Sequence, residues 1–540
     1  METRARCISK GAVMAGALLP SKHAAGLHAL LPGLGDQIHP HLVDSCEAQT
    51  PPSEPAAKDS PLGTPGAAPP CPTADLGAAG GLCSMQRSAR YGRYLVTQRA
   101  VAAGQVLLEE TPLLVVPKVD SETSCLACMA PLRVEWTACR TCGGPLCATD
   151  CRGAHHGATE CRLLQRMGFR EAPHLEALIK ELNVILGPLR LLLLVQESRA
   201  AREAFLSLES HAAVRLRLPV GKFVEEHIVG GLRQRLGLAL PRETVHHACG
   251  VLDTNCFEVT LDNAGHGRAI FPAAAMMNHS CVPNAHWWFY RGRLVVCAAT
   301  ALPRGTPVLI SYTHALWGTR VRAAQLTTCK MFTCTCERCR DPAERGSHLS
   351  SVRCRVCGDV VVPPSQRQDA WQCRACGNTV EAALVEALVH AGATQLAHLR
   401  EETAAGVVAA VTHLSRLLGP HHYVVARARH CFLEVLFAAP LSEAPKDLLQ
   451  EAVNLARHLT AVLQLLEPGV SRMTGLLLYY ETAAATELLL REGTGDEEAR
   501  QTLLNQATHV ESLLQYDRFL PRAALLSAAL REWCPAARTQ

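Results

Sequence analysis

Four polar residues, Asn278-His279-Ser280-Cys281, directly follow the apolar pair Met276-Met277. Pro283 stops a regular helix from continuing through this row, because proline lacks the N–H group that a helix interior needs. Buried polar groups need hydrogen-bond partners, so a row this polar beside apolar residues is typical of a site rather than of a core. The sequence therefore predicts a functional site at this row.

Cysteine is the second residue type whose spacing predicts chemistry. The chain has 25 cysteines, many of them in CxxC, CxC or CxxxC groups. A secreted disulfide protein normally begins with a signal peptide, whereas residues 1–30 mix basic residues with only short apolar stretches. Grouped cysteines in an intracellular chain are typical of zinc sites. We expect residues 1–30 to be an unstructured extension, with a mitochondrial transit peptide as the alternative.

The first cysteine-rich run has the ligands for two zinc ions. Zn²⁺ takes four tetrahedral thiolate or imidazole ligands, and seven cysteines with one histidine complete two such sites. These ligands are Cys125, Cys128, Cys139, Cys142, Cys147, Cys151 and Cys161, with either His155 or His156. Unrelated buried thiols are the alternative, and this density and spacing disfavour it.

Two further cysteine groups follow in the second half of the chain. Cys334, Cys336 and Cys339 provide only three ligands, so a fourth must come from elsewhere, and Cys281 is the candidate; Cys329 has no assigned role. Two CxxC pairs with the spacing of a zinc ribbon come next, namely Cys354, Cys357, Cys373 and Cys376. Four free thiols are the alternative for these pairs.

Short strands are expected to position the polar row. Alternating or apolar runs bounded by turn residues predict strands at 94–96, 106–109, 113–116 and 253–259, and a hairpin of 286–290 with 294–298. A last buried strand, 308–312, ends in Tyr312. By itself, a tyrosine at a strand end is more often a core residue than a catalytic one.

The other segments are helical or irregular. Leu175, Leu178, Ile179 and Leu182 follow the spacing of one helix face, and Gly230-Gly231 is expected to interrupt the helices that follow. Beyond residue 378 the pattern is helical, in units of roughly forty residues that resemble a degenerate tetratricopeptide array. Residues 1–86 are expected to be disordered, since 13 of the 32 residues from Pro51 to Leu82 are Pro or Gly.

Composition excludes several classes of protein. The net charge is +4 with a pI near 8.1, which is too mild to indicate direct nucleic-acid binding. No apolar run approaches the roughly 20 residues of a membrane span, so no membrane association is expected. An apolar content of 48% supports sizeable cores.

The motifs in this order resemble the Smyd family of SET and MYND domain proteins, over about residues 88–540. The resemblance lies in NHSCxPN at 278–284, the cysteine run at 125–161, and CxCxxC at 334–339. The GRYLV, DTNxFEV and SYTHALWGT segments and the added CxxC pairs look most like the arthropod Smyd-A branch. The resemblance implies that Cys125, Cys128, Cys147 and Cys151 hold one MYND zinc ion. Cys139, Cys142, Cys161 and His156, favoured over His155, would hold the other.

The resemblance also implies a site for S-adenosylmethionine and a catalytic role for Tyr312, whose hydroxyl would orient the lysine amine. The implied cofactor-binding residues are Gly92, Asn255, Asn278, His279, Tyr312 and Phe332. Two positions depart from the family pattern: Tyr94 replaces the second glycine of the opening turn, and Ala275 replaces a common serine.

The predicted fold is α+β, a split SET β-fold with an inserted MYND zinc finger and a helical insert. A post-SET zinc site and a C-terminal α-helical, TPR-like domain complete it. The predicted segments are a disordered extension (1–86), the SET N-terminal part (87–124), the MYND finger (125–161), the helical insert (162–250), the SET core (251–315), the post-SET region (316–342), a zinc ribbon (343–378) and the helical domain (379–540).

Two functions follow from the resemblance. The first is an S-adenosylmethionine-dependent protein-lysine N-methyltransferase that holds about four zinc ions and acts on histone or non-histone lysines, in transcriptional regulation. The second is a zinc-stabilised scaffold or corepressor with a weakened or silent SET site. Both imply protein partners, which bind the MYND finger through proline-containing peptides or bind the helical tail. The family works in the nucleus and the cytoplasm.

Overall fold

The computed structural model describes residues 81–533, except 120, 133–135, 152, 264, 364–369 and 494–496. The described chain forms two compact units: residues 81–111 with 276–533, and residues 112–275. Residues 1–80 of the predicted disordered segment, which include Cys46 and Cys71, lie outside the described residues. Strand β1 (Cys83–Ser88) begins within the predicted disordered range, so order starts earlier than expected.

The strands of the first unit form four small sheets. β1 pairs with β2, β3 and β10 flank β11, β9 lies parallel to β12, and β13 to β16 form an antiparallel sheet in chain order. After β1, their bounds are β2 (Gly92–Thr97), β3 (Val106–Glu110), β9 (Asn278–His279), β10 (Ala285–Tyr290), β11 (Arg293–Ala298), β12 (Leu309–Ile310), β13 (Val352–Arg353), β14 (Val360–Val362), β15 (Ala370–Cys373) and β16 (Thr379–Glu381).

The hairpin β10–β11 confirms the predicted one. Its two-residue loop, Arg291-Gly292, has φ values of 48° and 73°, and positive φ at both loop positions is the type I′ geometry that suits the twist of paired strands. The predicted last strand is shorter than expected, since only Leu309–Ile310 pair in the sheet. That pairing sets Leu309 opposite Asn278 and Ile310 opposite His279, which brings Tyr312 beside the polar row.

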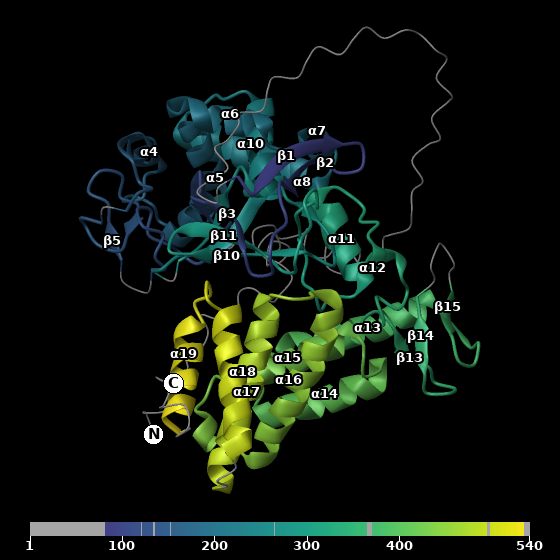
Figure 1. Cartoon of the computed structure of the whole chain (residues 1–540). Coiled ribbons are helices and arrows are strands. Elements are labelled where there is room, and N and C mark those ends of the chain that lie inside the picture. The colour runs from purple at the N-terminus through teal and green to yellow at the C-terminus, as the bar shows by residue number, and fades with distance from the viewer. Residues whose placement is uncertain are drawn as a thin grey trace, which may run out of the picture. The chain divides into compact units, whose positions relative to one another are not determined.

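Helices dominate the C-terminal part of the first unit, as predicted. Consecutive helices from α14 to α19 contact one another and lie side by side in Figure 1. The helices of this unit are α11 (Thr319–Lys330), α12 (Glu337–Arg340), α13 (Ala382–His398), η6 (Leu399–Glu401), α14 (Ala404–Leu418), α15 (Tyr423–Leu436), η7 (Leu441–Glu443), α16 (Lys446–Leu466), α17 (Arg472–Glu492), α18 (Glu497–Leu513) and α19 (Leu520–Trp533). Among the described residues, none of the helices combines the length and apolar content that a membrane span needs.

The end of the helical region covers one face of the hairpin. Tyr516, between α18 and α19, lies with its ring centroid 6.2 Å from that of Trp288 and 6.0 Å from that of Tyr290, both on β10. A backbone hydrogen bond from Val470 to the Ala299 carbonyl adds a second attachment. The strands and the helices of this unit therefore pack as one body.

The second unit holds the sheet β4–β8–β7, the two-stranded sheet β5–β6 and the helical insert. Its strands are β4 (Leu114–Pro117), β5 (Thr137–Ala138), β6 (Pro145–Leu146), β7 (Cys256–Thr260) and β8 (His266–Ile270). Its helices are α4 (Ala158–Leu164), η3 (Gln165–Met167), α5 (Leu175–Glu197), α6 (Arg199–Ser207), α7 (Ala212–Arg215), α8 (Pro219–Phe223), η4 (Val224–Val229), α9 (Gly230–Leu236) and α10 (Arg242–Asn255). A 3-10 turn, η5 (Ala274–Met276), leads from this unit into β9.

Two predictions in this unit were wrong. The expected strand 253–259 begins only at Cys256, because α10 runs on to Asn255. Gly230-Gly231 does not interrupt the helix: α9 follows η4 without a break, and the missing side chain of Gly231 lets the helix approach Ile185 closely. A β-carbon built at Gly231 would lie 3.0 Å from Ile185, so Gly231 serves helix packing.

Candidate functional site

His279 links the polar row to Tyr312. The backbone N–H of Tyr312 donates to Nδ1 of His279 at 2.9 Å, and Nε2 of the same ring lies 3.1 Å from Sγ of Cys281. With Nδ1 accepting, the neutral imidazole carries its proton on Nε2 and donates toward the sulfur. Burial lowers the pKa of His279 to about 4, which keeps the ring neutral.

Tyr312 lies with its hydroxyl inside the site. The hydroxyl donates to the carbonyl oxygen of Met277 at 2.5 Å, so its oxygen keeps lone pairs available to a ligand. Burial raises the pKa of Tyr312, which keeps the phenol protonated. Tyr312 can therefore orient a polar group but does not act as a base.

Three aromatic rings converge at this point. The Phe332 centroid is 6.4 Å from that of Tyr312, with the rings nearly perpendicular at 88°, and 6.0 Å from that of His279. Phe332 follows Met331, which ends α11 with a left-handed φ of 58° and turns the chain toward the polar row. The result is a half-buried ring beside neutral hydrogen-bonding groups, an arrangement that suits a flat heteroaromatic ligand.

The opening turn meets the polar row through Asn278. The side-chain amide of Asn278 donates to the carbonyl oxygen of Tyr91 at 2.6 Å. Gly92, the next residue, has φ +62°, and a β-carbon built there meets nothing within 4 Å. The left-handed backbone explains why a glycine stands at position 92. The open space beside it leaves room for a ligand at the edge of the site. The structure thus brings Gly92, Asn278, His279, Tyr312 and Phe332 together in one unit.

Asn255 belongs to the second unit, at the end of α10. Its amide donates to the carbonyls of Glu209 at 2.7 Å and Val251 at 2.8 Å. Tyr94, which replaces the second glycine of the opening turn, directs its hydroxyl to Gln86 at 3.2 Å. Both side chains have structural partners within their own units.

The cysteines of residues 334–339 meet the polar row. Ligand atoms of Cys281, Cys334, Cys336 and Cys339 all lie within 4.8 Å of one another. Sγ of Cys281 is 3.5 Å from that of Cys339 and 4.0 Å from that of Cys334. Because His279 and Cys281 belong to one short segment, the cysteine cluster and the aromatic site are held by the same stretch of backbone.

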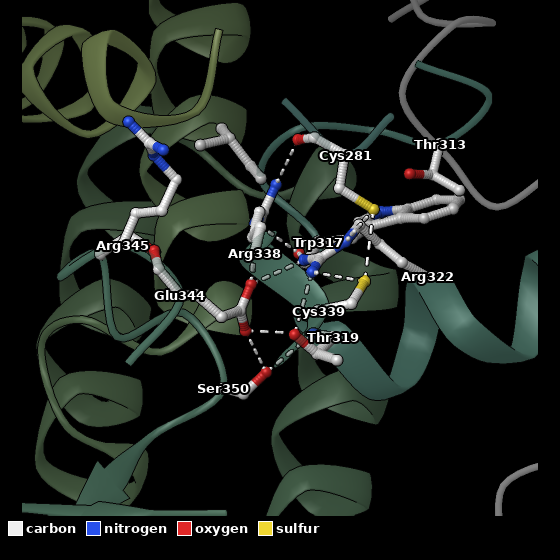
Figure 2. A network of polar contacts seen from close by, with 12 residues as sticks. Cys281, Thr313, Trp317, Thr319, Arg322, Arg338, Cys339, Glu344, Arg345 and Ser350 are labelled. Atoms are coloured by element: carbon white, nitrogen blue, oxygen red, sulfur yellow. Dashed lines mark hydrogen bonds and ion pairs between the residues drawn. The ribbon is translucent and has the colours of Figure 1, made fainter. Parts of the chain in front are cut away.

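Two arginines and one glutamate are buried behind this cluster, and Figure 2 shows them pointing toward one another. Arg322, Arg338 and Glu344 are each 0% exposed. Oε2 of Glu344 accepts from Arg322 at 2.7 Å and from Arg338 at 2.9 Å, while Nε of Arg322 lies 3.3 Å from Sγ of Cys281. Burial alone would raise the pKa of Glu344, but the two guanidinium groups hold it below its usual value.

The charges of this network fit a metal–thiolate centre. Four thiolates around Zn²⁺ carry a net charge of −2, and the Arg322–Arg338–Glu344 group adds +1 in direct contact with the sulfur atoms. Sequence reasoning missed these residues. Arg338 stands between two ligands in the CxCxxC motif, but nothing in the sequence distinguishes Arg322 or Glu344 from surface charges.

The finger in the second unit contains two ligand clusters that alternate along the chain, as the resemblance implied. One cluster is Cys125, Cys128, Cys147 and Cys151, and the other is Cys139, Cys142, His156 and Cys161. His156 rather than His155 lies in the second cluster, with Nε2 3.5 Å from Sγ of Cys142.

A buried carboxylate orients His156. Its Nδ1 lies 3.0 Å from Oε1 of Glu160, and Glu160 pairs with Arg190 at 2.7 Å. Arg190 also donates to the Leu126 carbonyl at 2.7 Å, which connects α5 to the finger. A carboxylate behind a metal-binding imidazole fixes its tautomer and strengthens its metal binding. Glu160, on α4, was also missed, although its position four residues after His156 is a signal that a search could use.

The ribbon cysteines Cys354, Cys357, Cys373 and Cys376 form the fourth cluster. Cross-pair sulfur distances are 3.7 Å for Cys354–Cys376 and 3.5 Å for Cys357–Cys373. The sheet β13–β16 around them shares a core with the helical region, through Val361 and Trp371.

The sulfur distances fit zinc in all four clusters. A tetrahedron with Zn–S bonds of about 2.3 Å has edges of about 3.8 Å, and a disulfide needs about 2.05 Å. The observed sulfur pairs lie between 3.5 and 4.0 Å. These clusters can hold four zinc ions, with thiolate and imidazole ligands only, and closed sites of this kind are structural.

We expect metal analysis of the purified chain to give about four zinc ions per molecule, because four four-ligand clusters are present. The double variant Cys357→Ser with Cys376→Ser should lower the count by one. The matching Cys329→Ser variant should leave it unchanged, since Cys329 is in none of the clusters. Two or fewer ions per chain would contradict the assignment.

Comparison with known proteins agrees with this arrangement. The SET domain family model matches residues 92–313. The SET domain-containing protein SmydA-8, isoform A, of Drosophila melanogaster is 31% identical over 299 residues, covering 53% of this chain and 63% of that protein. N-lysine methyltransferase SMYD2 of Homo sapiens is 38% identical over 90 residues, covering 16% of this chain and 21% of that protein. The chain thus spans less than two thirds of the length of either relative.

Solved structures were also compared. The SET domain of LSMT bound to lysine and AdoHcy aligns over 86% of this chain and 92% of its own, with 13% identity and a TM-score of 0.26. A similarity this low supports no argument about function. The SET match, the similarity to SmydA-8 and the four clusters in this order show that the chain contains a SET domain and is similar, over about half of its length, to a SET-domain protein of the arthropod SmydA type.

Proposed function

We propose that the protein is an S-adenosylmethionine-dependent protein-lysine N-methyltransferase. The observation that carries the proposal is the convergence of His279, Tyr312 and Phe332 in one unit, with Asn278 next to His279 and bonded to the Tyr91 carbonyl. The SET match and the lysine methyltransferase named among its relatives support the same reaction class. Histone or non-histone lysines are the proposed substrates, and transcriptional regulation in the nucleus or cytoplasm is the proposed setting.

The roles of the residues follow from their chemistry. S-adenosylmethionine, when bound, would supply an activated methyl group. Phe332 would stack on the adenine, and Asn278 and His279 would provide backbone and ring contacts beside the open space at Gly92. The Tyr312 hydroxyl, whose hydrogen is donated to Met277, would accept a hydrogen bond from the lysine amine and align it. Methyl transfer to a neutral amine is a direct displacement, so a protonated tyrosine suffices.

Protein partners are the second part of the proposal. A MYND finger held by two zinc ions and the helical region from α13 onward would both offer surfaces for other proteins. Proline-containing peptides are the proposed ligands of the finger.

A scaffold or corepressor function is the second candidate, and two observations favour it. The Asn255 amide is already bonded to the Glu209 and Val251 carbonyls, and Tyr94 fills the place of the second glycine. In that function the zinc clusters and helices would bind partners, and the SET site would be silent.

Titration calorimetry of the zinc-loaded full chain with S-adenosylmethionine would separate the two candidates. We expect saturable binding that Phe332→Ala weakens roughly ten- to a hundredfold, because loss of an aromatic stack on a base costs about 1–3 kcal/mol. Phe437→Ala, a half-buried phenylalanine of the helical region, is the matched control and should leave the Kd unchanged. Folded wild-type protein that binds no cofactor would favour the scaffold.

A further inference from the structure

A cavity of about 190 Å³ lies in the first unit, on the other side of the segment that carries Tyr312. Ser311, Thr313 and His314 line it, whereas Tyr312 itself does not. Glu467 and Arg472, from the end of α16 and the start of α17, form the facing wall. The cavity therefore adjoins the proposed catalytic residue along the backbone, where neighbouring Cα atoms are only about 3.8 Å apart.

The size of the cavity limits what it can hold. Sites for whole small molecules usually measure about 300–1,000 Å³, so a volume of about 190 Å³ suits one amino-acid side chain better. The cavity is partly open to solvent, which lets a side chain of another protein enter.

One carboxylate on the cavity wall, that of Glu467, has no ion-pair partner among the described residues. Glu467 accepts a hydrogen bond from the Ser471 hydroxyl at 2.7 Å and makes no ion pair with any residue that the structure describes. Arg472 pairs with Asp517, so its positive charge is balanced. Burial lowers the pKa of His286 and of His314, so both imidazoles are neutral. Among the residues that line the cavity, Glu467 is the one carboxylate, and the one cation, Arg472, is held by Asp517, which lies outside the lining.

Trp287 adds an aromatic surface to the same cavity. Indole faces attract cations, especially the guanidinium group of arginine. A carboxylate and an indole lining one small opening favour the entry of a positively charged side chain and disfavour a negative one.

We propose that this cavity binds a lysine or arginine side chain of the protein substrate, within about three residues of the methylated lysine, and that Glu467 determines this preference. The inference rests on the proposed function, because it assigns the cavity to the substrate of that reaction. An extended peptide advances about 3.3–3.6 Å per residue, so a neighbouring side chain reaches the cavity while the target lysine faces Tyr312.

Methyl transfer by the full chain to a library of peptides with one central lysine would test the proposal. We expect the wild type to prefer lysine or arginine over glutamine at one flanking position by about five- to tenfold in kcat/KM. Glu467→Gln should reduce this ratio to about one, and Glu467→Arg should reverse it in favour of glutamate. A purely structural role for Glu467 would not reverse the preference, so reversal is the decisive result.

Glu443→Gln is the matched control. Glu443 is an exposed carboxylate before α16, whereas Glu467 follows α16, and a 21-residue helix separates them by about 30 Å. This variant should keep the wild-type preference. A preference that persists in Glu467→Gln, or a wild type with no preference, would overturn the inference and leave the proposed reaction standing.

Peptide binding distinguishes failure of the inference from failure of the proposed function. Fluorescence anisotropy with the same labelled peptides needs no turnover, and we expect a similar five- to tenfold preference that is lost in Glu467→Gln. Absence of transfer, together with Glu467-dependent binding of basic peptides, would reject the enzyme and keep the cavity as a cation-binding site. Equal binding of basic and glutamine peptides by the wild type would reject the cavity assignment.

Discussion

Tyr312→Phe is expected to lower methyl transfer by at least about a hundredfold while the protein stays folded. The variant keeps the ring that packs against His279 and Phe332 but removes the oxygen that would align the amine. Positioned polar groups of this kind contribute about 10²–10⁴-fold to rates. The Met277 carbonyl loses a donor, which costs about 1–3 kcal/mol and is less than the stability of a typical domain.

Single-turnover transfer of a labelled methyl group to the best library peptide is the measurement. Thermal unfolding, zinc content and cofactor binding of the same variant show whether the fold is intact. Tyr290→Phe, a half-buried tyrosine of β10, is the control and should transfer at the wild-type rate. Wild-type turnover by Tyr312→Phe would remove Tyr312 from the catalytic role.

Glu344→Ala is expected to destabilise the first unit by about 3–5 kcal/mol. It would leave Arg322 and Arg338, both 0% exposed, without their shared carboxylate. Removing one partner from a buried ion-pair network costs this much because the remaining charge has neither water nor a counter-charge. Urea unfolding followed by tryptophan fluorescence measures the loss, since the carbonyl of Trp317 accepts from Arg338.

Glu337→Ala provides the comparison. Glu337 pairs with Arg345 in the same segment, but its side chain is 75% exposed. Exposed pairs contribute about 0–1 kcal/mol, so this variant should unfold close to the wild-type midpoint. If both variants lost the same small amount, the buried network would not be a source of stability.

The zinc clusters were predictable because most of their ligands stand close together in the sequence. CxxC pairs hold two ligands within one turn, and counting to four gives the number of sites, whereas the alternating pairing in the finger was implied by the family resemblance. Cys281 stands 53 residues before Cys334, so it was predicted as the fourth ligand from the ligand count and not from local spacing. Its place in the cluster depends on the pairing of β9 with β12, which only the complete fold provides.

The end of α10 shows why the alternation of polar and apolar residues led to a wrong strand prediction. Asp253 to Val259 alternates polar and apolar residues as a strand does, yet Asp253 accepts hydrogen bonds from Arg215 and Arg268. Asn255 bonds to carbonyls at Val251 and Glu209. These partners lie up to 46 residues away in the chain, and tertiary contacts of this kind outweigh a short local pattern.

The aromatic contacts of Tyr516 have a consequence for synthesis of the protein on the ribosome. Trp288 and Tyr290 are covered by a residue that is made roughly 230 positions later, which takes about 11–46 s at ordinary elongation rates. During that interval the nascent SET strands present an apolar face with no partner. Transient binding by a chaperone, or a premature stop before Tyr516, would therefore affect the yield of protein whose SET site is complete.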